Sequence, residues 1–541
     1  MGVTCNHPWI DGTGCAISGS GEIQKYLGAP LGIDIHPTKL HDYCLDKISA
    51  RLTSWSSKLL SFTGRTILIR HVLQAIPIYH MMFVETSKRT CDKLEKIFRE
   101  FLWGHKTAGG KKLALVAWDK LTRPRAEGGL GFKNMQAHSQ ALLTKWVTEA
   151  LDSPNTEWAQ LFRANLGLMT WENGKNMRRQ GYNILDRILL GKITAFGRQN
   201  YTAGLWKAWL PLRFNLSLHP QNAVLPSRWR ISDVINSMPE FGNQESHVRM
   251  QITTTLARLH IKNLIDLKNL QDTDNETWER RLVRIRGIDR FILEEASLLL
   301  DTLYTTWEIS GDIDQEASAW KWLDQEKDLS CFSLKNKHAY TLLSKMPADT
   351  ERWNRRWNCT NSEDPWRRRW AKLWHSDLPT RGKTFLWRIL AHGLYTGARA
   401  FKLGFTDVNC LCCPDRLESI SHIFLECKHA TASWNSLRRM HTKATGFQAF
   451  PTCITFLAVL DCCLEVKSRN SAFLFLLYAT LWNLWLARNA QLHEGTSRYF
   501  SAELLTSQAS DLIFAVCTRC RPGPKLAQLR KARWWIDASC P

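Results

Sequence analysis

The chain has 541 residues, of which 44% are hydrophobic, so it is long enough for several domains with buried cores. Lysine and arginine number 72 against 50 acidic residues, and the net charge of +22 points to a polyanionic partner or, less specifically, to a basic solvated surface. The sequence contains no Walker loop, nucleotide-binding glycine fingerprint or nucleophile elbow, which argues against an enzyme for a small-molecule substrate.

The first six residues indicate in which cellular compartment the protein is expected. Residues 1–6 lack the apolar core of a secretory signal, and Asn6 breaks the myristoylation pattern. We therefore expect an intracellular protein whose cysteines are reduced and available to a metal rather than paired in disulfides. The sequence does not choose between a nuclear and a cytoplasmic location.

The N-terminal part predicts helices. Between residues 45 and 59 apolar side chains recur at spacings of three and four, which is the stripe of an amphipathic helix, with Lys58 among its polar positions. A second apolar helix is expected at 67–76, stopped by Pro77, and a third at 93–103. The prediction for the whole chain is a mainly α fold.

The middle of the chain is poorer in signals. One proline and three glycines between residues 124 and 131 predict a turn-rich loop or short hairpin. Residues 151–330 carry no site motif and no internal repeat, and helices are expected there at 256–270 and 277–304.

Residues 351–402 combine positive charge with tryptophan, since they hold 12 Lys or Arg against 4 Asp or Glu. Trp366, Trp370 and Trp374 recur every four residues, which predicts the buried stripe of a helix. The basic side chains near them either bind phosphates or form an ordinary solvated helix face. The candidate nucleic-acid-binding residues are Arg367, Arg368, Arg369, Lys372 and Arg388, together with Lys58 and Arg65 nearer the N-terminus.

Three thiols and one imidazole lie within 18 residues, in the spacing Cys410-x2-Cys413-x8-His422-x4-Cys427. The first pair lets two thiolates of one tight turn reach the same ion, and the second pair is separated by about one helical turn. Because all four ligand positions are filled, no place remains for an activated water. We predict a structural Zn²⁺ ion rather than a catalytic one.

Other cysteines and histidines could mimic this motif or compete with it. With 16 cysteines a chance Cys-x2-Cys is not rare, and Cys517-x2-Cys520 is interpreted as such a case because no second ligand pair follows it. Cys412 and His429 are possible competing ligands. We expect Cys412 to face away within its turn and His429 to be an exposed helix residue.

Residues 471–487 are almost free of charge and rich in Leu, Phe and Trp. They reach only the short limit for a bilayer span, and Asn483 lies among them. We predict a buried helix rather than a membrane segment.

Several short motifs surround the Cys/His spacing in a fixed order. They are Phe332-Ser-Leu-Lys335, Ala339-Tyr340, Leu373-Trp374 and Leu378-Pro-Thr-Arg-Gly-Lys-Thr-Phe-Leu-Trp-Arg388 before it, and Trp434 and Leu481-Trp-Asn-Leu-Trp-Leu-Ala-Arg-Asn489 after it. Together with the Cys-x2-Cys and His-x4-Cys pairs, they resemble the reverse-transcriptase zinc-binding domain of plant non-LTR (LINE-type) retrotransposon polyproteins.

The N-terminal part is similar to the same polyproteins just after their polymerase core. Lys25-Tyr-Leu-Gly-Ala-Pro-Leu-Gly32 resembles the last palm strand and its turn, and the residues from Trp55 to Tyr79 resemble the thumb. The resemblance implies a palm remnant at 1–36, a thumb-like helical domain at 37–150, a variable helical and loop region at 151–330, the zinc-binding domain at 331–440 and a helical tail at 441–541.

Polymerase chemistry needs carboxylates that hold two metal ions. In this family two of them form a paired Asp-Asp upstream of the motif that begins at Lys25, and the sequence has no Asp-Asp dipeptide. Only 24 residues precede Lys25, and no ribonuclease H segment follows the helical tail. We therefore expect that the chain is not an enzyme.

Two functions of different classes remain open. The first is a non-catalytic reverse-transcriptase fragment that binds zinc and that binds the sugar-phosphate backbone of RNA or DNA through its thumb and zinc-knuckle regions, with weak sequence specificity. The second is a structural or protein–protein interaction module, and a decayed retroelement product without activity is a further possibility. Salt-dependent binding to a single strand separates the first from the second. No membrane or small-molecule partner is expected.

Overall fold

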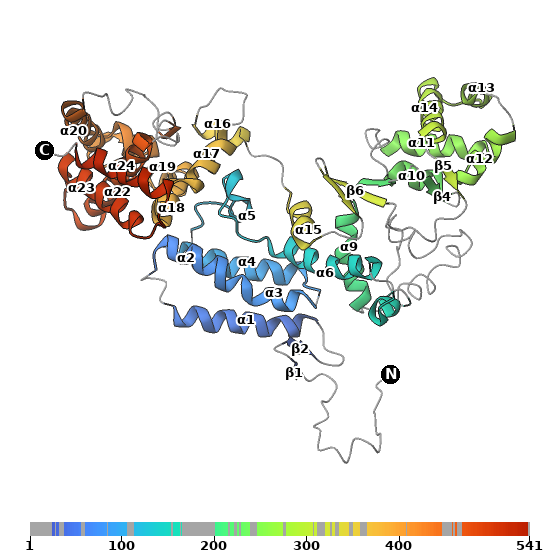
Figure 1. Ribbon diagram of the computed structural model, residues 1–541, viewed down its shortest axis with the longest axis horizontal. Helices are drawn as coiled ribbons and strands as arrows, with labels where there is room; N and C mark the ends of the chain where they lie inside the picture. Colours follow the sequence, from blue (N-terminus) through green and yellow to red (C-terminus); the bar gives the residue numbers. More distant parts are fainter. Residues whose placement is uncertain are drawn as a thin grey trace, which may run out of the picture. The chain divides into compact units, whose positions relative to one another are not determined.

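In a computed structural model of the protein, the structure describes residues 24–26, 29–31, 37–55, 60–83, 85–104, 113–152, 155–162, 164, 201–214, 217–220, 224–226, 229–237, 246–273, 277–306, 308–310, 320–324, 327–330, 335–345, 350–357, 365–406, 408–445, 457, 460–461 and 468–538. This part of the chain is mainly helical, as predicted, and its strands form only small sheets (Figure 1).

Two compact units share the chain. The first comprises residues 1–47, 75–92 and 135–345, and the second comprises residues 48–74, 93–134 and 346–541. The division falls within α1 (Pro37–Ser54) and within α4 (Lys88–Trp103). The expected thumb-like region at 37–150 contributes segments to both units.

The first unit has a helical core. Trp206 and Trp209 on one helix are fully buried and three residues apart, so they lie on the same face. The Trp146 indole donates a hydrogen bond of 2.8 Å to the Met82 carbonyl oxygen. The elements of this unit are β1 (Gln24–Tyr26), β2 (Ala29–Leu31), α3 (Ala75–Met81), α6 (Met135–Asp152), α9 (Tyr201–Phe214), β3 (Ser217–Pro220), β4 (Val224–Pro226), α10 (Ile231–Ser237), α11 (Ser246–Arg258), α12 (Leu264–Thr273), α13 (Trp278–Val283), α14 (Arg290–Thr306), β5 (Glu308–Ser310), β6 (Trp320–Asp324), β7 (Lys327–Ser330) and α15 (Asn336–Leu343).

The strands of this unit form a three-stranded antiparallel sheet in the order β3-β6-β7, an antiparallel pair β1-β2 and a parallel pair β4-β5. Both long helices expected here are divided. The first breaks into α11 and α12, because the Asp266 carboxylate accepts hydrogen bonds from the N–H groups of Lys262 and Asn263 and starts a new helix. The second breaks into α13 and α14 around Gly287, whose φ is +79°.

Pro77 does not stop a helix, contrary to the prediction. The expected helix at 67–76 is replaced by α2 (Phe62–Leu68), the π turn η1 (Ile69–Leu73) and the start of α3. Pro77 lies in the first turn of α3, where a backbone N–H has no intrahelical acceptor. Because proline has no N–H, it therefore removes no hydrogen bond from this helix.

The second unit contains the tryptophan-rich core. Of the predicted stripe, Trp366 and Trp370 are buried and Trp374 is half-buried. Trp353 and Trp387 are buried as well. Besides α2 and η1, the elements are α5 (Trp118–Thr122), η2 (Arg125–Glu127), α16 (Thr350–Trp357), α17 (Pro365–His375), α18 (Thr380–Leu390), α19 (Gly397–Phe401), β8 (Asn409–Cys410), β9 (Cys413–Leu417), η6 (His422–Glu426), α20 (Lys428–Thr445), α22 (Ser468–Glu494), α23 (Ala502–Cys517) and α24 (Pro524–Asp537).

The predicted turn at 124–131 fits closely against these tryptophans. The Trp387 indole donates a hydrogen bond of 2.8 Å to the Gly128 carbonyl oxygen. Gly128 has a φ of +87°, and a Cβ atom there would lie 2.8 Å from the Trp370 ring. Part of the expected thumb also belongs to this core, since the Phe62 ring of α2 stacks on Trp387 with centroids 6.2 Å apart. These contacts are the physical reason why the thumb-like region is divided between the two units.

The uncharged stretch at 471–487 forms the centre of α22, and residues 472–481 are buried, as predicted. Asn483 is also buried and donates hydrogen bonds to the Ala479 carbonyl oxygen and to Gln508 Oε1 on α23. Helices α22, α23 and α24 pack against one another. None of the helices in the described ranges has the length and apolar character of a membrane span.

Candidate metal centre

A short hairpin brings Cys410 and Cys413 together. β8 and β9 pair antiparallel with these two cysteines opposite each other, and the two residues between them form the turn. Asn409 Nδ2 donates a hydrogen bond of 2.7 Å to the Pro414 carbonyl oxygen across the hairpin. Residues opposite each other on antiparallel strands have neighbouring side chains, so both thiols reach the same point, as the spacing predicted.

His422 and Cys427 are held by a π turn, not by an α-helix. The Cys427 N–H donates a hydrogen bond of 2.7 Å to the His422 carbonyl oxygen, which closes a five-residue turn over η6. In an α-helix, side chains five residues apart would be separated by about 140° around the axis. The wider π turn brings them to one side. Ser419 Oγ accepts the His422 N–H at 3.0 Å, and the Trp434 indole donates to the Phe424 carbonyl oxygen at 2.8 Å.

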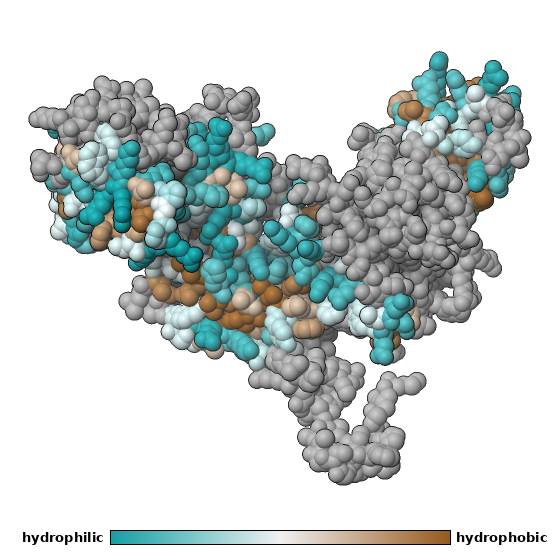
Figure 2. All heavy atoms as spheres, in the orientation of Figure 1, coloured by the Kyte–Doolittle hydropathy of each residue, from teal (hydrophilic) through white to brown (hydrophobic). Residues whose placement is uncertain are grey.

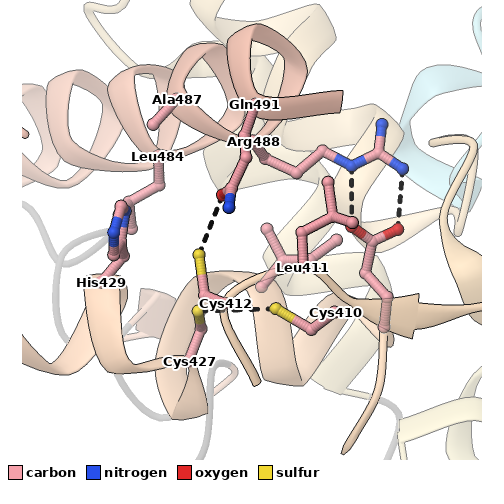
Figure 3. A pocket seen from close by; sticks show the side chains of 11 residues that line it. Cys410, Leu411, Cys412, Cys427, His429, Leu484, Ala487, Arg488 and Gln491 are labelled. Carbon is pink, nitrogen blue, oxygen red and sulfur yellow. Dashed lines mark hydrogen bonds and ion pairs between the residues drawn. The ribbon is translucent and has the colours of Figure 1, made fainter. Parts of the chain in front are cut away.

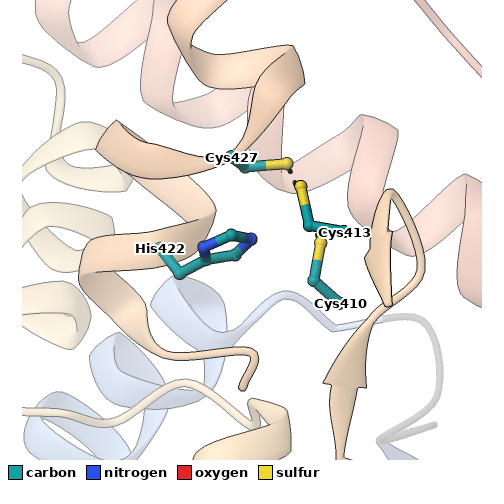
Figure 4. Close-up of side chains that lie close together, drawn as sticks. All are labelled: Cys410, Cys413, His422 and Cys427. Atoms are coloured by element: carbon teal, nitrogen blue, oxygen red, sulfur yellow. Dashed lines mark hydrogen bonds between the residues drawn. The ribbon is translucent and has the colours of Figure 1, made fainter. Parts of the chain in front are cut away.

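The four side chains converge (Figure 4). A ligand atom from each lies within 4.8 Å of the others, and the Sγ atoms of Cys410 and Cys427 are 3.8 Å apart. Two thiolates bound to a tetrahedral zinc ion at about 2.3 Å would lie about 3.8 Å from each other. The observed separation therefore fits a metal. Within the described ranges, no other group of three or more His, Cys, Asp or Glu residues has such a geometry.

The electrostatics of this cluster favour a bound cation. Cys410, His422 and Cys427 are buried and Cys413 is half-buried. His422 Nε2 has no hydrogen-bond partner among the described residues, and Nδ1 lies 3.9 Å from a Glu426 carboxylate oxygen. Burial raises the pKa of the Cys427 thiol to about 12 and lowers the pKa of the His422 imidazole. A metal ion supplies the positive charge that favours the thiolate and accepts the imidazole lone pair.

The two possible competitors lie outside the cluster. Cys412 is not one of the four clustered ligands: its Sγ donates a hydrogen bond of 2.9 Å to Gln491 Oε1 on α22, although the thiol lies beside that of Cys427 (Figure 3). His429 is half-buried instead of exposed, because its ring lies against Tyr499 with centroids 4.2 Å apart. Cys517 and Cys520 are free thiols and form no metal-binding group with other residues that the structure describes.

A buried ion pair that the sequence did not predict joins the hairpin to α22. Arg488 donates two hydrogen bonds to the Glu418 carboxylate, at 2.8 and 2.7 Å, and both side chains are largely buried, with 14% and 8% exposed (Figure 3). The same carboxylate accepts the Gly397 N–H at 2.8 Å. A Cβ atom on Gly397 would lie 1.8 Å from the Val408 carbonyl oxygen, so this close approach requires glycine.

The three arginines of α17 differ in their surroundings. Arg367 and Arg368 are exposed, and the surface over α17 is coloured mainly hydrophilic in Figure 2. Arg369 is not available to a phosphate, because its guanidinium makes a bidentate ion pair with Asp461 at 2.7 Å and lies over the Trp366 ring. Lys372 on the same helix is half-buried. Arg369 therefore has an acidic partner within the protein, whereas Arg367 and Arg368 are the exposed members of the predicted set.

Arg65 and Arg388 face the protein interior. Arg65 donates hydrogen bonds to the carbonyl oxygens of Leu60 and Leu102, and burial lowers its pKa. Arg388 lies over the Phe62 ring, and burial, with a smaller effect of nearby Arg65, lowers its pKa to about 10. The Arg388 contact joins α18 to α2, and the Arg65 contact with Leu102 joins α2 to α4, so both guanidinium groups have partners within the protein. Lys58 lies outside the described residues.

Comparisons with known proteins agree with this geometry. Residues 336–434 match a protein family described as zinc-binding in reverse transcriptase. A stretch of 114 residues, 21% of this chain, is 36% identical to an Arabidopsis thaliana protein named "putative ribonuclease H protein" and covers 18% of it. Another match, over 17% of this chain, is 35% identical to an uncharacterized mitochondrial protein of the same plant and covers 58% of it.

The chain thus spans less than two thirds of each of these relatives. The family match confirms the resemblance to the reverse-transcriptase zinc-binding domain, and it lies within the predicted range of 331–440. All four clustered side chains fall inside it.

Proposed function

We propose that this chain is a non-catalytic, retroelement-derived reverse-transcriptase fragment. In it a structural Zn²⁺ ion stabilises a module that binds the sugar-phosphate backbone of RNA or DNA. The closed Cys3His cluster carries the proposal, because four protein ligands leave no coordination position for a reacting water. Cys410, Cys413, His422 and Cys427 would hold the ion. When bound, the ion would hold three thiolates and one imidazole together and would not activate a substrate.

The support for nucleic acid as the partner is electrostatic. The net charge is +22, and Arg367 and Arg368 present two guanidinium groups to solvent in the module that the family match covers. Guanidinium groups on a surface bind phosphates and release the counterions condensed on the strand. Such contacts position a strand without reading its bases, so sequence preference should be weak.

Replacing Arg367 and Arg368 with alanine should flatten the salt dependence of single-strand binding. Each phosphate contact contributes roughly 0.7 to the log–log slope, so the double variant should lose about 1.4. The measurement is fluorescence anisotropy with an oligonucleotide at several salt concentrations. The charge-matched control is Arg530→Ala with Lys531→Ala on α24, where both side chains are also exposed. Equal slopes in the two variants would favour a structural or protein–protein interaction module.

The purified chain should not extend a primer on an RNA or DNA template in the presence of Mg²⁺ and nucleotides. A closed metal centre can stabilise the module but cannot supply the pair of carboxylate-bound ions that nucleotide transfer requires. A primer-extension assay measures this, with a known polymerase as the positive control. Extension that co-purifies with the chain and persists in the Cys413→Ser variant would contradict the non-catalytic part of the proposal.

A further inference from the structure

A basic cleft lies beside the metal centre. It has a volume of about 880 Å³, and its walls come from α16, the segment 392–402 that includes α19, and the residues just before η6. None of its lining residues is acidic. Five carry a positive charge, and they are Arg352, Arg355, Arg356, Arg399 and Lys402.

Two nitrogen atoms in this cleft are buried without a hydrogen-bond partner among the described residues, Arg399 Nε and His392 Nε2. By contrast, Arg356 is held in place, because it donates a hydrogen bond of 3.1 Å to the Ala391 carbonyl oxygen and lies over the Trp353 ring. The Arg399 Nε–H is always a donor, and buried donors normally find an acceptor, so an anion that reaches Arg399 would satisfy it.

The charge in the cleft already acts on His392. Burial, together with the positive charges of Arg356, Lys402 and Arg399, lowers the pKa of this imidazole to about 4. The ring is therefore neutral at neutral pH. Bound phosphate would oppose the neighbouring positive charges and raise the pKa of His392.

Exposed aromatic side chains accompany the cleft residues in the chain. Tyr395, Phe401 and Phe405 are 38%, 63% and 46% exposed, and Phe401 directly precedes Lys402. Unpaired bases stack on such faces, whereas the bases of a duplex are already stacked on each other. Arg399 and Lys402 line the cleft and Phe401 lies between them in the sequence, so one segment carries both cationic side chains and an exposed aromatic ring, a combination found in proteins that bind single strands.

We infer that this cleft binds backbone phosphates of single-stranded RNA or DNA and that Phe401, which directly precedes the lining residue Lys402, stacks on an unpaired base. This inference rests on the proposed function and specifies its site and its preference for single strands. The metal would stabilise one wall of the cleft. Residues 419–421 line the cleft and directly precede His422, which belongs to the Cys/His cluster.

The test uses the full-length, zinc-loaded chain with a labelled oligothymidine strand and a duplex of equal length. Arg399→Ala with Lys402→Ala should weaken single-strand binding at least tenfold at low salt and flatten the slope by about 1.4. Phe401→Ala should weaken the strand complex about fivefold or more and leave the duplex complex unchanged. Arg530→Ala with Lys531→Ala is the charge-matched control, and unchanged zinc content shows that each variant is folded.

An independent measurement uses the His392 imidazole signal in NMR, assigned with a His392→Gln variant. Pyrophosphate should raise the pKa of His392, and the Arg399/Lys402 double variant should lose this response. If the cleft variants bind the strand like the control while the Arg367/Arg368 variant does not, the inference is wrong and the proposed function stands. If the unmodified chain binds no strand at all, the proposed function fails. A response to pyrophosphate alone would then leave only a small-anion site and overturn the assignment to a strand.

Discussion

Replacing Cys413 with serine and His422 with alanine should abolish stoichiometric zinc binding and unfold the segment from β8 to η6. Two of the four ligands would be lost, and structural zinc sites of this type contribute apparent binding free energies of about 10–16 kcal/mol that act as folding free energy. Elemental analysis of the purified chain measures the zinc content. Hydrogen exchange of the amides in β9 and η6 measures the local unfolding.

Cys412→Ser is the matched control for this experiment. Cys412 lies in the same hairpin, but its thiol donates to Gln491 and is not one of the four clustered ligands. The control should retain one zinc ion per chain and keep the protection of η6. Less than stoichiometric zinc in the unmodified chain, or zinc that survives loss of both ligands, would refute the assignment.

Replacing Arg488 with alanine should lower the free energy of unfolding of the second unit by about 3–5 kcal/mol, because it leaves the Glu418 carboxylate buried without its counterion. Chemical denaturation followed by tryptophan fluorescence measures the change. The loosened hairpin should also release zinc to a chelator faster, since Glu418 directly follows β9 and leads into the turn that carries His422.

A second arginine–glutamate pair provides the control. Arg498 contacts Glu494 at 2.8 Å, but both side chains are about half exposed, at 51% and 54%. Such surface pairs contribute about 0–1 kcal/mol, so Arg498→Ala should have little effect. Combining Arg488→Met with Glu418→Gln should recover part of the loss, because no charge then remains buried and Gln still offers an acceptor to the Gly397 N–H. Equal losses for Arg488→Ala and Arg498→Ala would show that burial of the first pair does not matter.

The parts of the site that depend on local chain geometry could be predicted from the sequence. The pairing of Cys410 with Cys413 follows from a two-residue turn, and the stripe of Trp366 and Trp370 follows from helical periodicity. The π turn was not predictable in this way. The His-x4-Cys spacing brings the two side chains together only if the helix widens into a π turn. That turn depends on the hydrogen bond from the Cys427 N–H to the His422 carbonyl oxygen and on Ser419 Oγ, which accepts the His422 N–H.

Interactions between distant segments were not predictable. Arg369 looked like its two neighbours in sequence, and only folding shows that Asp461, 92 residues away, neutralises it. The same holds for Arg488 and Glu418, which are 70 residues apart. The helix breaks near residues 260 and 287 depend on local caps and a left-handed glycine that apolar periodicity does not register. The nucleic-acid contacts themselves stay a prediction.

The interleaved segments of the second unit have a consequence for how the protein is made. The hydrogen bond from Trp387 to Gly128 joins residues 259 positions apart, and the stacking partner of Trp387 is Phe62, still earlier in the chain. During synthesis the segments 48–74 and 93–134 leave the ribosome long before the residues that complete their core. Contacts between residues so far apart in the sequence form slowly. Until they form, the apolar side chains of these two segments stay exposed and can aggregate. The nascent chain should therefore need chaperone protection until α18 has emerged.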